Sequence, residues 1–149
     1  MKRHKYQIIQ VEDLRRVIND LFINREEIQL AYLYGSYAKE LQTEYSDIDI
    51  GVILNEEFKE SPLYFADLCL GIEKHFNFKI NVDLRILNSA TPRFLFQVLK
   101  NGMILFEKSK TFRYEFELKV LSMYQEIKPM LDMYDKVSVM EVLKDEYRP

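Results

Sequence analysis

Residues 34–54 read Tyr34-Gly35-Ser36-Tyr37-Ala38-Lys39-Glu40-Leu41-Gln42-Thr43-Glu44-Tyr45-Ser46-Asp47-Ile48-Asp49-Ile50-Gly51-Val52-Ile53-Leu54. Apolar residues lead into Gly35, and a second apolar run follows Asp49. Glycine tolerates the sharp turn that must follow a strand at this point. We therefore predict a strand, a tight turn, a short helix, a loop and a second strand across this stretch.

The Gly35-Ser36 pair indicates a phosphate site. A turn that opens a helix presents free backbone N–H groups, and such groups suit a phosphate. Ser36 would add its hydroxyl at the same point. Taken alone, a Gly-Ser pair is more often an ordinary helix cap. Lys39, one turn into the predicted helix, could contact a phosphate, although a plain surface charge is an equally good interpretation.

Asp47 and Asp49 follow Ser36 after ten residues. Two aspartates at i and i+2 on a strand point to the same face, as two ligands of one divalent metal site must. A calcium-binding EF-hand loop is excluded because Gly51 stands at its fifth position, where a ligand is required. Ser46 could hydrogen-bond a carboxylate or a backbone group and fix its orientation. A phosphate site beside a carboxylate pair favours transfer of a nucleotidyl group.

Asp83 is the third candidate carboxylate. Residues 78–86 alternate between apolar and polar, so we predict a strand with Asn81, Asp83 and Arg85 on one face. If this strand lies beside the strand that carries Asp49, three like charges meet, and cations must neutralise them. Two Mg²⁺ ions would bind a triphosphate, activate the attacking oxygen and neutralise the leaving pyrophosphate. An ordinary surface aspartate on an exposed sheet face is the alternative.

Two further roles follow from this arrangement. Asp83 is the best candidate for helping to deprotonate an acceptor hydroxyl. Arg85 could contact the β- and γ-phosphates, although it could equally be a surface charge.

The rest of the pattern predicts an α/β (α+β) domain in which helices flank a small mixed sheet. The expected elements are a helix over 11–28, strands over 30–34 and 48–54, a helix over 62–76, a strand over 78–86, a helix over 92–101, a strand over 103–106 and a helix over 112–133. We expect the last helix to break or bend near Pro129, and residues 145–149 to be frayed.

Composition points to one globular domain over residues 1–149, because 48% of the residues are hydrophobic and no Ser/Gly/Pro-rich linker divides the chain. The formal net charge of -3 argues against a general nucleic-acid binder. The one cysteine, Cys69, fits a reducing cytosol and a buried place in a helix. No apolar run approaches the length of a membrane span. We therefore expect a cytoplasmic protein that does not enter a membrane.

With Gly35, Ser36, Asp47 and Asp49 in this spacing, the chain resembles the nucleotidyltransferase superfamily with the polymerase-beta-like fold. The third carboxylate of that superfamily maps to Asp83. The likeness covers a catalytic core of about residues 30–106 and leaves a C-terminal helical segment of about residues 109–145. The chain is most similar to the minimal nucleotidyltransferases (MNT), and it looks like the antitoxin half of HEPN–MNT toxin–antitoxin pairs.

This resemblance implies a protein adenylyltransferase that uses ATP and Mg²⁺. It would transfer AMP to a tyrosine of a partner HEPN toxin and thereby silence the RNase activity of the toxin. Asp47, Asp49 and Asp83 would be the catalytic and metal-binding residues. The nucleotide contacts would come from Gly35, Ser36, Lys39, Ser46 and Arg85. A hetero-oligomer is implied, with the C-terminal helix and its exposed aromatic residues as a plausible contact.

One position departs from the family pattern. Many relatives have Arg-Gly after the alanine, where this chain has Lys39-Glu40. The positive charge is kept, while the glutamate adds a negative charge near the triphosphate. Because all three carboxylates are present, we expect an active enzyme.

Two alternatives stay open. A non-catalytic antitoxin could neutralise the toxin by binding alone, and the loss of an aspartate would have favoured it. A nucleotidyltransferase could instead act on a small hydroxyl compound such as an aminoglycoside. The segment after Phe106 leaves little room for the added domain that such enzymes generally need.

Overall fold

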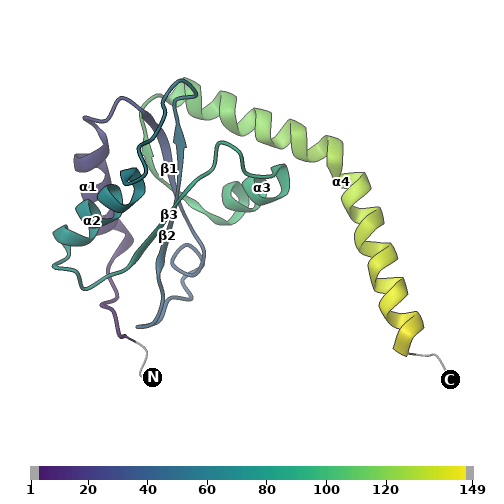
Figure 1. The fold of residues 1–149 in the computed structure, drawn as a ribbon. Coiled ribbons are helices and arrows are strands. Elements are labelled where there is room, and N and C mark those ends of the chain that lie inside the picture. The colour runs from purple at the N-terminus through teal and green to yellow at the C-terminus, as the bar shows by residue number, and fades with distance from the viewer. Residues whose placement is uncertain (1–3, 147–149) are drawn as a thin grey trace.

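The computed structural model describes residues 4–146 and has eight helices and strands in the predicted order (Figure 1). The elements are α1 (Val11–Phe22), β1 (Ile28–Tyr34), β2 (Ile48–Leu54), α2 (Tyr64–His75), β3 (Val82–Ile86), α3 (Pro92–Asn101), β4 (Met103–Glu107) and α4 (Lys110–Glu146). The four strands form one sheet in the order β3-β2-β1-β4. β2 and β3 are parallel and the other pairs are antiparallel, which confirms the predicted mixed α+β fold.

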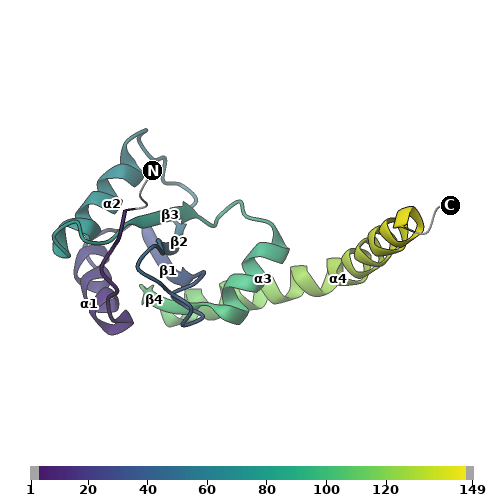
Figure 2. The ribbon, with the colours of Figure 1, turned by 90° about the horizontal axis from the view of Figure 1, so that it is seen from below.

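Helices cover both faces of this sheet (Figure 2). Alternate residues of a strand point to opposite faces, so each strand contributes to two cores. Leu33, Ile50 and Val52 belong to the core beneath α1 and α2. Tyr32 and Ile53 belong to the core beneath α3 and the first part of α4.

The segment after Gly35 differs from its prediction, because residues 36–40 form turns and no helix. The N–H of Lys39 donates to the Gly35 carbonyl at 3.3 Å, and that of Leu41 to the Ser36 carbonyl at 2.9 Å. Glu40 then adopts a φ of 56°, in the left-handed region, which a continuing right-handed helix does not use. The chain therefore forms a single turn after Gly35, and this turn does not continue into a helix.

The predicted strand over 78–86 begins only at Val82. Asn77 and Phe78 have φ values of 52° and 57°, so the backbone leaves α2 through left-handed residues. Residues 78–81 alternate between apolar and polar side chains, as a strand would, but their backbone is not extended in a strand. The prediction was wrong for that half of the segment.

Helix α4 is longer than predicted and continues through Pro129 to Glu146. Figure 1 shows the helix changing direction part-way along and projecting away from the sheet. Proline lacks the N–H that a helix interior uses, so Pro129 gives a physical reason for a bend. The expected fraying does not include Asp145 or Glu146, which are helical, while residues 147–149 lie outside the described part of the chain.

The aromatic residues of α4 serve two purposes. Phe116 packs against Tyr32 with ring centroids 6.5 Å apart, and Tyr124 stacks on Phe96 at 3.9 Å. Tyr114 and Tyr134 are 57% and 70% exposed. Only part of the aromatic-rich segment is therefore available to a partner. Within residues 4–146, no helix is both long enough and apolar enough to cross a membrane.

Candidate active site

The turn after β1 packs directly against Asp49. Tyr34 is the register partner of Asp49 across the antiparallel β1–β2 pair, so Gly35 follows at the same level of the sheet. Gly35 has a φ of 73°, and a Cβ atom built on it would lie 2.2 Å from Oδ2 of Asp49. Both facts require glycine at this position. The predicted phosphate turn and the predicted carboxylate thus lie in contact.

Asp49 also faces Asp83, its register partner in the parallel β2–β3 pair. Burial raises the pKa of Asp49, and the carboxylates of Asp83 and Asp47 raise it further, while the Arg85 guanidinium opposes them. A cation would stabilise the charged form of Asp49, which burial and the neighbouring carboxylates disfavour. The structure therefore brings together two of the three predicted carboxylates.

Asp47 lies slightly apart from this pair. Its Oδ1 accepts a hydrogen bond of 3.0 Å from Nδ2 of Asn81. Among residues 4–146, no three Asp, Glu, His or Cys side chains form a ready metal-binding group. The donor set still fits Mg²⁺, which prefers carboxylate oxygens and retains several waters. Asp49 and Asp83 are preassembled, and Asp47 would join them by exchanging its bond to Asn81.

The other predicted contacts lie around the carboxylates. Nη2 of Arg85 is 3.7 Å from Oδ2 of Asp83, and the two side chains are 61% and 43% exposed, so solvent weakens this ion pair. Oγ of Ser46 accepts a 2.9 Å hydrogen bond from the Thr43 N–H, which is the backbone contact that the sequence allowed. Ser36 is half-buried in the turn, and Lys39 is exposed on it, since the helix that would have carried Lys39 does not form.

Tyr34 lies opposite Asp49 on β1, and the sequence analysis did not single it out. Its ring packs edge-on against Phe94, with centroids 5.6 Å apart. Its hydroxyl is buried and has no hydrogen-bond partner among the described residues. Burial raises the pKa of Tyr34 to about 12; the Arg85 guanidinium opposes this rise, and the carboxylates of Asp49 and Asp83 add to it, so the phenol stays protonated at neutral pH. The position directly before Gly35 was read only as the apolar end of a strand.

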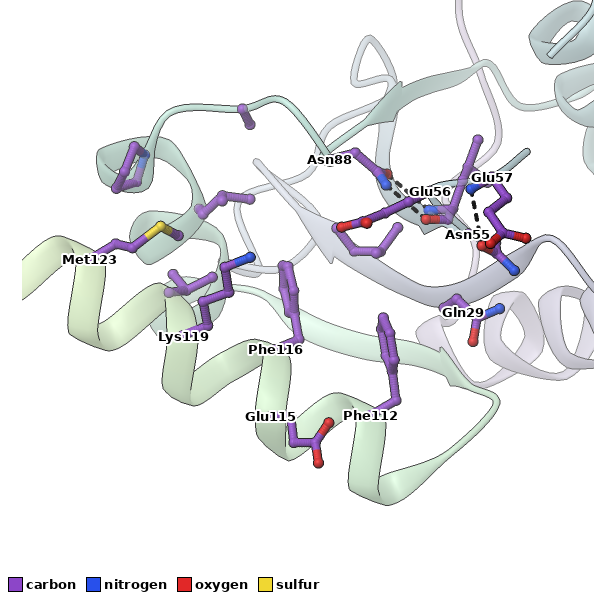
Figure 3. A pocket seen from close by; sticks show the side chains of 16 residues that line it. Gln29, Asn55, Glu56, Glu57, Asn88, Phe112, Glu115, Phe116, Lys119 and Met123 are labelled. Carbon is purple, nitrogen blue, oxygen red and sulfur yellow. Dashed lines mark hydrogen bonds between the residues drawn. The ribbon is translucent and has the colours of Figure 1, made fainter. Parts of the chain in front are cut away.

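A cavity of about 700 Å³ lies between α4 and the far end of β2 (Figure 3). Phe112 and Phe116 form part of its apolar wall. The Asn88 amide is already bonded twice to the backbone of Leu54, at 2.9 and 2.7 Å. The lining of the cavity also includes three carboxylates, from Glu56, Glu57 and Glu115. Such a lining disfavours a triphosphate, so the phosphate site belongs at the aspartate end of the sheet.

Comparison with protein families gives one match, over residues 16–111, to the family described as Polymerase beta, Nucleotidyltransferase. The chain belongs to this family. The match contains the Gly35 turn and the three aspartates at 47, 49 and 83. No curated protein sequence matches the chain.

Solved structures of toxin–antitoxin complexes are similar to almost the whole chain. One is a toxin–antitoxin with AMP-PNP, with 27% sequence identity and a TM-score of 0.64. A second is an MntA–HpeT complex in which two aspartates two residues apart are replaced by glutamate, with 25% identity and a TM-score of 0.65. A third is a tri-AMPylated Shewanella oneidensis HEPN toxin in complex with MNT antitoxin, with 26% identity and a TM-score of 0.63.

Each of these similarities covers 87% of this chain and 99% of the other chain. The correspondence therefore extends beyond the catalytic core into α4. It confirms the predicted resemblance to the minimal nucleotidyltransferase antitoxins.

Proposed function

We propose that this protein transfers AMP from ATP to a tyrosine hydroxyl of a partner HEPN toxin and releases pyrophosphate. The observation that carries the proposal is the Asp49–Asp83 pair in contact with the Gly35 turn. The similar complexes support the choice of nucleotide and acceptor, because one was solved with AMP-PNP and another contains a tri-AMPylated HEPN toxin.

Each residue of the site would have a role that follows from its chemistry. The backbone of Gly35 and Ser36 would bind phosphate oxygens, and Lys39 and Arg85 would offset the charge of the triphosphate. Asp83 would accept the proton of the tyrosine hydroxyl as its oxygen attacks the α-phosphorus. A new P–O bond to tyrosine then forms while the bond to pyrophosphate breaks.

Magnesium completes the site. Asp47, Asp49 and Asp83 would hold it, because Asp49 and Asp83 are partners on adjacent strands, Asp47 directly precedes β2, and the charges of Asp83 and Asp47 already act on Asp49. When bound, Mg²⁺ neutralises the phosphate oxygens and the developing charge on the leaving group.

Helix α4 offers the surface for the toxin in the proposed hetero-oligomer. Its second half exposes large apolar side chains, including Met130, Met133 and Tyr134, which are 65%, 68% and 70% exposed. Exposed apolar residues at helical spacing are typical of a helix that packs on a partner. A protein partner would bury them, whereas a small hydroxyl compound would not.

The test is the intact mass of a HEPN protein encoded beside this chain, after incubation with the chain, ATP and Mg²⁺. We expect mass gains in steps of one AMP, and none with a chain that carries both Asp47→Asn and Asp49→Asn. A stable complex without a mass gain would contradict catalysis and identify a binding antitoxin. Neither complex nor modification would redirect the search to small hydroxyl acceptors.

A further inference from the structure

Tyr32 and Tyr34 lie two residues apart on β1, on the same face of the sheet, yet their hydroxyls differ. The Tyr32 hydroxyl donates to Oε1 of Glu117 at 3.0 Å. The Tyr34 hydroxyl is buried and has no partner within residues 4–146. A buried donor without an acceptor destabilises the folded state, because it has lost its hydrogen bonds to water. In the metal-free protein the Tyr34 hydroxyl therefore destabilises the fold. A phenylalanine at this position would fill almost the same space without that cost.

The surroundings of Tyr34 indicate what this hydroxyl could serve. Tyr34 stands opposite Asp49 across the strand pair. The charges that act on its phenol are those of Arg85, Asp49 and Asp83, so this charged cluster lies near the Tyr34 side chain. The edge-on contact with Phe94 holds the ring in place. A protonated phenol in this position can donate a hydrogen bond to a carboxylate.

We propose that Tyr34 is a positioning residue whose hydroxyl donates a hydrogen bond to the Asp49 carboxylate when the site is loaded, fixing the orientation of that carboxylate toward the cation. The inference rests on the proposed function, which supplies the cation. Carboxylates that ligate a metal are commonly held by such outer hydrogen bonds, and losing one costs about 10–100-fold in metal affinity or activity. Without the cation, the Asp49 carboxylate lies against the Gly35 turn and receives no hydrogen bond from the Tyr34 hydroxyl.

The experiment compares Tyr34→Phe with the matched control Tyr32→Phe in the full chain. The melting temperature is measured without metal and again with Mg²⁺ and AMP-PNP, and Mg²⁺ affinity is measured by calorimetry. For Tyr34→Phe we expect an unchanged or higher melting temperature without metal, a smaller shift on loading and an affinity about 10–100-fold weaker. For Tyr32→Phe we expect a lower melting temperature and an unchanged loading shift.

The results that would overturn the inference are separate from those that would overturn the function. A full wild-type loading shift and affinity in Tyr34→Phe would overturn the inference alone. A melting temperature of metal-free Tyr34→Phe that falls as far as that of Tyr32→Phe would also overturn it, because the hydroxyl would then have a structural partner. A wild-type protein that shows no loading shift would overturn the proposed metal-dependent function, and the inference with it.

Discussion

The two faces of β2 carry different kinds of side chain. Toward α1 and α2 the strand places Ile48, Ile50 and Val52, all fully buried, and the described core contains no buried polar or charged residue. Toward the other side it places Asp49, beside Asp83 of the next strand. The first face stabilises the fold along its whole length, while the Asp49 end of the second face holds like charges that oppose folding. Stability and chemistry should therefore be separable by substitutions at neighbouring positions of one strand.

The largest expected effect is on the stabilising face. Ile50→Ala removes a fully buried side chain and should lower the free energy of unfolding by about 2–5 kcal/mol. Turnover per folded molecule should stay near the wild-type value, because Ile50 points away from the carboxylates. Urea denaturation and an AMP-transfer assay at low temperature check both statements. A turnover that falls in proportion to stability would break the comparison.

The adjacent residue should give the opposite result. Asp49→Asn removes a proposed metal ligand and should lower AMP transfer at least about a hundredfold. Without metal, the variant should melt at the same or a higher temperature than the wild type, because it no longer buries a charge and no longer has the repulsion from Asp83 and Asp47. Single-turnover rates and calorimetry are the measurements. Retained turnover would show that Asp49 does not hold the reactive group.

Two glycines sharpen the comparison further. In Gly35→Ala the new Cβ meets the Asp49 carboxylate in a left-handed backbone, so we expect a loss of about 1–2 kcal/mol from the backbone and roughly tenfold lower transfer. Gly71→Ala is the matched control, because nothing lies within 4 Å of its Cβ on helix α2. It should gain about 0.5–1 kcal/mol without affecting transfer. Equal behaviour of the two variants would contradict the proposed contact.

The sequence predicts those parts of the site that depend on local pattern. Spacing alone identified Gly35, Asp47 and Asp49, and the alternation around Asp83 put that carboxylate on the correct face of a strand. The order of helices and strands followed in the same way from apolar periodicity. Whether these residues perform the proposed roles is a prediction for the experiments above.

What the sequence missed depends on contacts between distant segments. The hydrogen bond from Asn81 that holds Asp47 aside joins two loops, and the missing partner of Tyr34 is a property of its whole surroundings. Glu40 and Phe78 adopt left-handed backbone that their residue types rarely take, so a predicted helix and half of a predicted strand did not form. At these two places the course of the chain around the sheet determines the backbone conformation, and the local preferences of the residues do not.

The smallest expected effect is a pH dependence of the difference in melting temperature between Asp49→Asn and the wild type. The pKa of Asp49 is raised above its ordinary value of 3.8, so its contribution favours the metal-free fold below that value and is lost as the pH rises through the raised pKa. The melting temperature of Asp49→Asn relative to the wild type should therefore increase from about pH 4 toward neutrality. Saturating Mg²⁺ should reverse the trend, because it binds the ionised wild-type carboxylate. A difference that does not change with pH would mean that neither burial nor the neighbouring carboxylates disfavour the charged form of Asp49, and the site would then gain no stability from neutralising that charge with a cation.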